Sequence, residues 1–306
     1  MSPTFRRSYH RWLALIGLVV AVAVQPVVAQ PTAFRTEDVA FASAGVRLAG
    51  TLLTPRHPVA AVVLVHGSGQ EKRMLEMAAR LAGRGLAVLT YDKRGVGQSG
   101  GVYAGPEVGT NNVDAANLGL LAADASAATN ALAAHLPAWQ GPIGLLGFSQ
   151  AGWVIPLAAT KNPAVGFIVL FSGPVVSARE QLRFQFFTSG HPRFWETHTE
   201  AEAREHLRHD PDRYQFADTD ARSLLATLVV PGLWLFGGQD IQAPVRLSME
   251  HLDTLKAQGK LYQYRLFPAL GHDTSSAKFN EPVEATIHWI EELASLKKPK
   301  TSRVKG

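Results

Sequence analysis

A serine near the middle of the chain has the neighbours of a reactive nucleophile. Residues 147–152 read GFSQAG and follow an apolar run over 143–148. Small residues on both sides of a serine, between a strand and a helix, indicate a turn so tight that larger side chains would collide there. Such a turn presents the Ser149 hydroxyl at the positive end of the following helix.

Two residues later in the chain can activate this serine. A hydroxyl is a weak nucleophile and needs a general base that a carboxylate orients. Asp240 ends the segment LFGGQD, and His272 lies in FPALGHD. Each follows a predicted strand, and a parallel sheet carries its site at the carboxyl ends of its strands. The structural alternatives are a helix-capping role for Asp240 and a surface position for His272.

A short glycine-containing loop adds a fourth component. Residues 66–69 read HGSG, directly after the apolar run 60–65. Backbone N–H groups of this loop, together with that of Gln150, are suited to donate hydrogen bonds to a developing oxyanion.

The elements that must position these residues alternate along the chain. Short apolar strands are predicted at 46–53, 60–65, 86–91, 143–148, 166–171, 233–236 and 262–267. Helical spacing of apolar residues predicts helices near 74–81, 118–132, 151–159 and 245–256, with a last one entered through Pro282. Strands that are apolar on both faces and alternate with helices predict an α/β fold with a mostly parallel, twisted sheet covered on both sides.

One segment interrupts this alternation. Residues 175–226 contain no clear strand but seven aromatic residues over 179–222. A structureless loop of this length is unusual, so the segment is predicted to be a helical insertion. We expect a lid whose aromatic underside, with Phe184, Phe186, Phe187, Phe194 and Trp195, lines an apolar pocket above Ser149. The alternative is a lid that packs its aromatic rings against one another.

Together these motifs resemble the α/β-hydrolases, in particular small bacterial carboxylesterases of the serine aminopeptidase-like and dienelactone-hydrolase-like branch. The matching pieces are HGSG, DKRGVGQS (92–99), GFSQAG, GGQD (237–240) and GH (271–272). The resemblance implies a triad of Ser149, Asp240 and His272, with the backbone N–H groups of Ser68 and Gln150 as the oxyanion hole. It also implies that Asp92 and Arg94 tie together the loop under the site.

Composition excludes several other functions. The chain has 306 residues and no cysteine, which excludes disulfides, thiolate metal sites and a cysteine nucleophile. Its net charge of +5 comes from the two ends; residues 30–296 hold 22 basic and 25 acidic residues, which argues against a nucleic-acid partner. The glycines of 95–100 match a dinucleotide fingerprint, but a glycine- and proline-containing loop follows in place of a helix. We expect no cofactor and no metal, although His191, His198, His206 and His209 lie close together in the sequence.

The first residues have the features of an export signal. Three arginines precede an apolar run over 13–24, and Val27-Val28-Ala29 forms a cleavage pattern. This run is shorter than the roughly 20 residues of a membrane-spanning helix. We therefore expect a signal peptide over 1–29, cleaved after Ala29, a periplasmic or secreted bacterial protein without stable membrane insertion, and a hydrolase domain over 30–306 that ends in a basic tail at 297–306.

Three functions stay open from the sequence. The first is a serine hydrolase that cleaves small to medium carboxylic esters through an acyl-enzyme. The second is a serine aminopeptidase, or an amide or thioester hydrolase, that uses the same triad. The third is a non-catalytic binding protein with the same fold, which the complete set of competent residues disfavours. The physiological substrate and the oligomeric state are not predicted.

Overall fold

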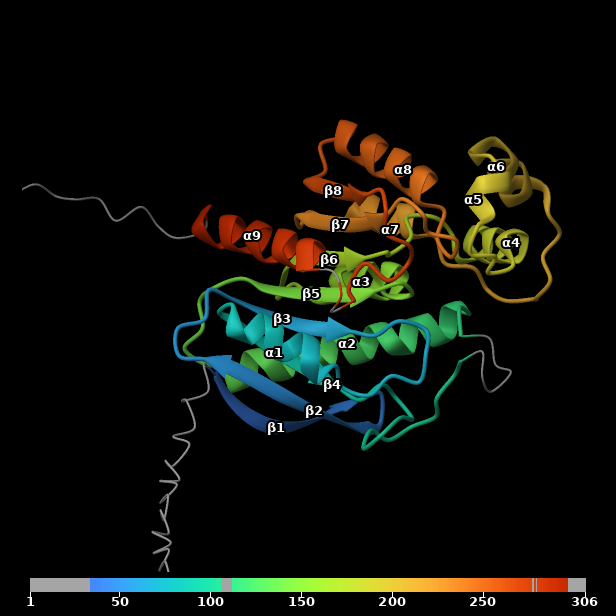
Figure 1. The fold of residues 1–306 in the computed structure, drawn as a ribbon. Helices are drawn as coiled ribbons and strands as arrows, with labels where there is room; N and C mark the ends of the chain where they lie inside the picture. Colours follow the sequence, from blue (N-terminus) through green and yellow to red (C-terminus); the bar gives the residue numbers. More distant parts are fainter. Residues whose placement is uncertain (1–33, 106–111, 277, 279, 297–306) are drawn as a thin grey trace, which may run out of the picture. The chain divides into compact units, whose positions relative to one another are not determined.

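The computed structural model describes residues 34–105, 112–276, 278 and 280–296. The predicted signal peptide and basic tail lie outside these residues. A sheet runs through the described chain in the order β1-β2-β4-β3-β5-β6-β7-β8 (Figure 1). Its strands are β1 (Phe34–Ser43), β2 (Val46–Pro55), β3 (Ala60–Val65), β4 (Leu86–Tyr91), β5 (Ile143–Phe148), β6 (Val165–Phe171), β7 (Gly232–Gly237) and β8 (Tyr262–Phe267).

Along the sheet, neighbouring strands pair in parallel from β4 through β3 to β8. At the other edge, β1 pairs with β2, and β2 with β4, in antiparallel fashion. Helices follow each strand from β3 onward: α1 (Leu75–Gly83), α2 (Ala115–His135), α3 (Ala151–Lys161), α4 (Ala178–Thr188), α5 (Phe194–Thr197), α6 (Glu200–His209), α7 (Ala221–Thr227), α8 (Val245–Ala257) and α9 (Asn280–Leu296). The predicted mostly parallel α/β-hydrolase sheet with helices on both faces is confirmed.

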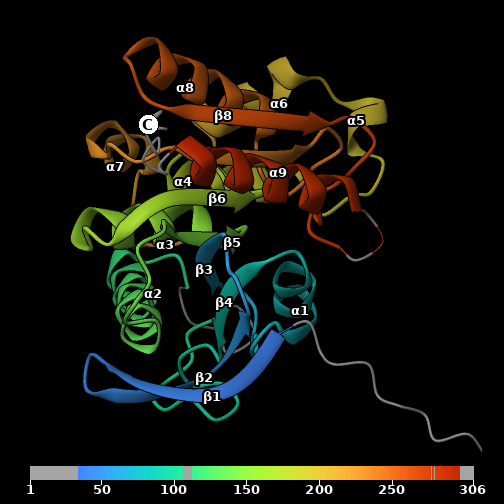
Figure 2. The ribbon, with the colours of Figure 1, turned by 90° about the vertical axis from the view of Figure 1, so that its left-hand side faces the viewer.

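Strand β3 explains why the sheet needs cover on both sides. Successive side chains of a strand point to opposite faces, and both sets are apolar here. Ala61, Val63 and Val65 pack in the cluster that includes α2, α3 and α8. Val62 and Leu64 pack in the cluster that includes α1 and α9 (Figure 2). All six residues of β3 are buried, so the strand lies between two hydrophobic cores and contributes side chains to both.

The first strand was not predicted, because it has the composition of an exposed edge. Within β1, only Val39 and Ser43 are buried. Charged residues, Arg35, Glu37 and Asp38, occupy its first half, so the apolar run that remains is only four residues long, over 39–42. A tight turn at Ala44 and Gly45, both with positive φ, returns the chain into β2, as is typical of a two-residue hairpin.

The segment between β6 and β7 is helical, as predicted, and contains α4, α5, α6 and α7. Its aromatic rings, however, pack mainly on one another. The rings of Phe184 and Phe194 are 0% and 1% exposed, and they contact Trp195 and Phe187. A ring without solvent-accessible surface cannot line an open pocket. The expectation of an aromatic pocket lining was therefore wrong for Phe184 and Phe194, which form the core of the insertion.

No helix in the described part of the chain combines the length and the apolar character needed to cross a bilayer.

Candidate active site

Ser149 occupies the turn between β5 and α3, at the carboxyl end of the sheet. Its φ of 49° lies in the left-handed region, which a non-glycine residue adopts at a cost. Its neighbours leave little space: a Cβ on Gly147 would lie 2.4 Å from the Cβ of Ala151, and one on Gly152 would lie 2.6 Å from Pro174. The glycines at these two positions therefore permit the sharp turn that the sequence predicted.

The structure brings His272 between Ser149 and Asp240. The imidazole Nε2 lies 2.8 Å from the hydroxyl oxygen of Ser149. On the other side of the ring, Nδ1 lies 2.8 Å from Oδ2 of Asp240. An ionised carboxylate only accepts hydrogen bonds, so Nδ1 carries the proton and Nε2 is left to accept the serine proton.

The loops that carry the acid and the base lie against each other. A Cβ on Gly237, at the end of β7, would lie 2.0 Å from the carbonyl oxygen of Gly271. Glycine at this position therefore lets the histidine loop approach the acid loop. The backbone N–H groups of Gln242 and Ala243 donate to Oδ1 of Asp240 at 2.7 and 2.9 Å. They leave Oδ2 for His272, which orients the carboxylate.

Two further contacts at this point were not predicted. Trp195 of α5 donates from its indole N–H to the backbone carbonyl oxygen of Asp240 at 2.9 Å. Thr274 pairs with the hydroxyl of Ser172 at 2.9 Å, just beyond His272. These residues belong to loops and to the insertion, where no periodic pattern in the sequence marks a partner.

The oxyanion candidates lie on two loops next to the nucleophile. Ser68 follows β3, and Gln150 directly follows Ser149 at the start of α3. Within the described chain, neither of their backbone N–H groups donates a hydrogen bond. The groups around Ser68 are paired: Gly67 N–H donates to Glu71 at 3.2 Å, and the Tyr103 hydroxyl donates to the Ser68 carbonyl at 2.9 Å.

The DKRGVGQS segment supports this end of the sheet. Asp92 accepts hydrogen bonds from the guanidinium and backbone N–H of Arg73 and from the backbone N–H of Gln98 at 2.9 Å. Arg94 pairs with Asp124 of α2 in the core. Both residues therefore occupy the structural positions that the family resemblance implied.

Several titratable groups in this region have shifted pKa values, and Asp92 and His66 are two of them. Burial opposes ionisation of Asp92, but the hydrogen bonds from Arg73 and Gln98 outweigh it and lower the pKa of Asp92 to about 2. Burial, with a smaller effect of the nearby Lys93 charge, lowers the pKa of His66 to about 3. His66 is therefore neutral near pH 7, and its Nε2 donates to the Tyr91 carbonyl at 2.6 Å.

The histidines of the insertion pack on aromatic rings. The His206 ring stacks on Phe187 at 3.7 Å between centroids, and the His198 ring stacks on Phe194 at 4.4 Å. His206 also contacts Asp210 at 2.9 Å. Among the described residues, no three histidine or acidic side chains are grouped as metal ligands.

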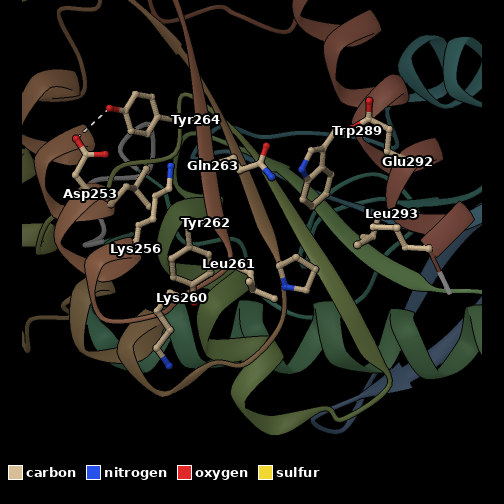
Figure 3. A pocket seen from close by; sticks show the side chains of 13 residues that line it. Asp253, Lys256, Lys260, Leu261, Tyr262, Gln263, Tyr264, Trp289, Glu292 and Leu293 are labelled. Carbon is tan, nitrogen blue, oxygen red and sulfur yellow. Dashed lines mark hydrogen bonds between the residues drawn. The ribbon is translucent and has the colours of Figure 1, made fainter.

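A pocket of about 570 Å³ lies away from these residues, between α8, β8 and α9 (Figure 3). Lys256, Tyr262 and Trp289 are among its lining residues, and Tyr264 donates to Asp253 at its rim. None of the five candidate residues lines it, so it is not part of this site.

A family comparison matches more than half of the chain. Residues 56–222 fit the model described as serine aminopeptidase, S33. The chain belongs to this family of α/β-hydrolases. The matched region contains Ser68, Ser149 and Gln150, whereas Asp240 and His272 lie beyond it. No curated protein matches the chain.

Solved structures share the fold at low sequence identity. An esterase from Pyrococcus furiosus superimposes with a TM-score of 0.60 at 17% identity, covering 85% of this chain and 90% of its own. An acylaminoacyl peptidase from Pyrococcus horikoshii gives 0.60 at 16% identity, covering 90% of this chain but 43% of its own. A dienelactone hydrolase from Anabaena variabilis gives 0.54 at 20% identity, covering 85% and 96%. The chain thus shares the α/β-hydrolase fold with these three enzymes.

Proposed function

We propose that the chain is a serine-dependent hydrolase that cleaves small to medium carboxylic esters through an acyl-enzyme. The observation that carries this assignment is the hydrogen-bonded series from Ser149 through His272 to Asp240, with both distances at 2.8 Å. The strained turn at Ser149 and the two N–H groups that face no other described acceptor add to it.

The reaction follows from these groups. Ser149 Oγ bonds to the ester carbonyl carbon while its proton passes to Nε2 of His272, and the carbonyl oxygen becomes an oxyanion at Ser68 and Gln150. Collapse of this intermediate breaks the bond to the alcohol oxygen, which takes the proton from His272. Water then attacks the acyl-enzyme by the same route, and the carboxylic acid leaves with Ser149 restored.

Labelling with a fluorophosphonate probe tests serine dependence. The wild-type chain should be labelled at Ser149 and should hydrolyse p-nitrophenyl acetate. Ser149→Ala should stay folded, lose the label and lose turnover by about 10⁴-fold or more. Normal ester turnover by this variant would refute the assignment. A wild-type chain that the probe does not label would support the hypothesis of a non-catalytic binding protein.

The family description keeps an aminopeptidase as the second candidate. Both functions use the same triad, so the acyl and leaving groups must separate them. We expect p-nitrophenyl esters from acetyl to octanoyl to be turned over with a higher kcat/KM than aminoacyl-anilides. Faster hydrolysis of the anilides would reverse the order of the two candidates.

We also propose export through a signal peptide cleaved after Ala29, on the basis of the arginines and apolar run of the first 29 residues. N-terminal sequencing of protein from a bacterial periplasm should then start at Gln30. Full-length chain in the membrane fraction would contradict cleavage.

A further inference from the structure

A buried lysine lies behind the HGSG loop, and the reaction as described does not use it. Lys93 is 2% exposed. Its ammonium donates to the carbonyl oxygens of Gly67 at 2.6 Å and Gly69 at 3.2 Å. It also lies 3.4 Å from the side-chain oxygen of Gln150. Burying a charge is costly unless acceptors surround it, so these oxygens account for its position.

The contact with Gly67 determines the direction of the next N–H group. The Gly67 carbonyl and the Ser68 N–H belong to one planar trans peptide group, in which they point in opposite directions. Because Lys93 holds the oxygen, the Ser68 N–H must point away from the lysine. The Glu71 carboxylate holds Gly67 N–H and the Tyr103 hydroxyl holds the Ser68 carbonyl, so the loop has little freedom to rotate.

The same lysine is connected to the second oxyanion donor. The side-chain oxygen of Gln150 faces the ammonium, while its side-chain nitrogen donates to the backbone carbonyl of Asn112 at 2.8 Å. The backbone N–H of this same residue is the donor that follows Ser149. Lys93 therefore joins the two loops whose N–H groups must converge on one oxygen atom.

We propose that Lys93 is a positioning residue for the oxyanion hole, which it aligns by holding the Gly67–Ser68 peptide group and the Gln150 side chain. This inference rests on the proposed serine-hydrolase function. A cation at a carbonyl oxygen also polarises the peptide group and strengthens its N–H as a donor. The gain is largest when negative charge develops on the substrate oxygen, so Lys93 should contribute to the transition state more than to substrate binding.

The test compares Lys93→Met with the wild type per labelled active site. Methionine keeps an unbranched side chain but removes the ammonium. Fluorophosphonate titration gives the active fraction, so a loss of folded protein does not count as a loss of rate. For p-nitrophenyl acetate, we expect kcat per labelled site to fall by about 10- to 100-fold, with KM changed by no more than about twofold.

A trifluoromethyl ketone supplies the readout that a merely structural role would not change. It forms a hemiketal with the serine, whose oxyanion occupies the hole. Its inhibition constant should rise in Lys93→Met by the same factor as kcat falls. Unchanged kcat per labelled site, or a fall in kcat without weaker inhibition, would overturn the inference.

Arg94→Lys is the matched control, because Arg94 is the adjacent buried cation but pairs with Asp124. It should lower thermal stability and leave kcat per labelled site unchanged. An equal fall in both variants would mean general damage to the loop and would overturn the specific role.

If Lys93→Met does not fold, Lys93→Arg decides. It keeps the charge, but a planar guanidinium does not reproduce an ammonium between two carbonyls. A fall in kcat per labelled site, with a rise in the inhibition constant of the trifluoromethyl ketone by the same factor, supports the inference. A kcat and an inhibition constant equal to those of the wild type overturn it. Failure of the wild type to label, or turnover by Ser149→Ala, instead refutes the proposed function, independently of any Lys93 variant.

Discussion

The loops of the candidate site and the helical insertion are held by different kinds of contact. Behind the site, charged groups are buried and each makes several hydrogen bonds, as Asp92 does with Arg73 and Gln98. The insertion has one small cluster of rings and ion pairs that stay partly exposed, such as that of Arg204 with Glu250.

This difference has a physical consequence. Buried groups with several partners hold their loops in one arrangement, because any shift leaves a polar group unpaired at a high cost. Partly exposed ion pairs contribute little, and water replaces them readily. The loops behind the site should therefore be rigid, whereas the insertion should open locally before the sheet unfolds.

The largest effect is expected from a change at the acid. Asp240→Asn keeps the shape of the side chain but cannot hold the tautomer in which Nδ1 of His272 carries the proton. We expect kcat for p-nitrophenyl acetate to fall by about 10⁴-fold with a similar KM. Asp273→Asn, at the exposed neighbour of His272, is the control and should retain activity. Full activity of Asp240→Asn would place the acid elsewhere.

These two regions also differ in how far the sequence predicted them. Ser149, Asp240 and His272 each follow an apolar run, and a parallel sheet brings the ends of its strands to one edge, so their proximity was predictable. The orientation of Phe184 was not, because it depends on how α4 packs against α6. Lys93 was missed since a lysine in a loop normally faces water, and β1 was missed since charged residues leave this exposed edge strand an apolar run of only four residues.

The second prediction concerns the core of the insertion. Phe184→Ala removes a fully buried ring and should lower stability by about 3–5 kcal/mol. Because this ring has no exposed surface, the preference between acetyl and octanoyl esters should not change in the folded variant. Calorimetry and ester turnover measure the two effects.

Phe186→Ala is the matched control for this cluster. The Phe186 ring is only partly buried and packs against Tyr214 and Arg213. Its removal should therefore lower the free energy of unfolding clearly less than Phe184→Ala does. A shift in chain-length preference on replacing Phe184 would restore the lid-pocket hypothesis for this ring.

The third prediction concerns acid stability of the framework. The pKa of Asp92 is about 2 in the folded chain and has its ordinary value, 3.8, when unfolded. A carboxylate whose pKa is lowered by folding stabilises the protein at pH values above its ordinary pKa. This contribution is lost as the pH falls through the pKa of the folded state. About 2 kcal/mol should therefore disappear between pH 5 and pH 2.

Denaturant titrations of the wild type and Asp92→Asn at several pH values measure this loss. Their difference in unfolding free energy should shrink by about 2 kcal/mol over that range. A constant difference between wild type and Asp92→Asn would show that Asp92 does not stabilise the loop through its charge.

The smallest effect is expected from an ion pair that ties the insertion to α8. Arg204 of α6 contacts both carboxylate oxygens of Glu250 at 2.7 Å. The Glu250 side chain is 57% exposed, so solvent and salt screen the pair. A double-mutant cycle with Arg204→Met and Glu250→Gln should give a coupling energy below about 1 kcal/mol that decreases as salt rises. Ester turnover should be unaffected, because in the described part of the chain neither side chain hydrogen-bonds to the loops of Ser149, Asp240 or His272. A coupling of several kcal/mol that persists in high salt would mean that the insertion is anchored as firmly as the framework, and the distinction between the two regions would be lost.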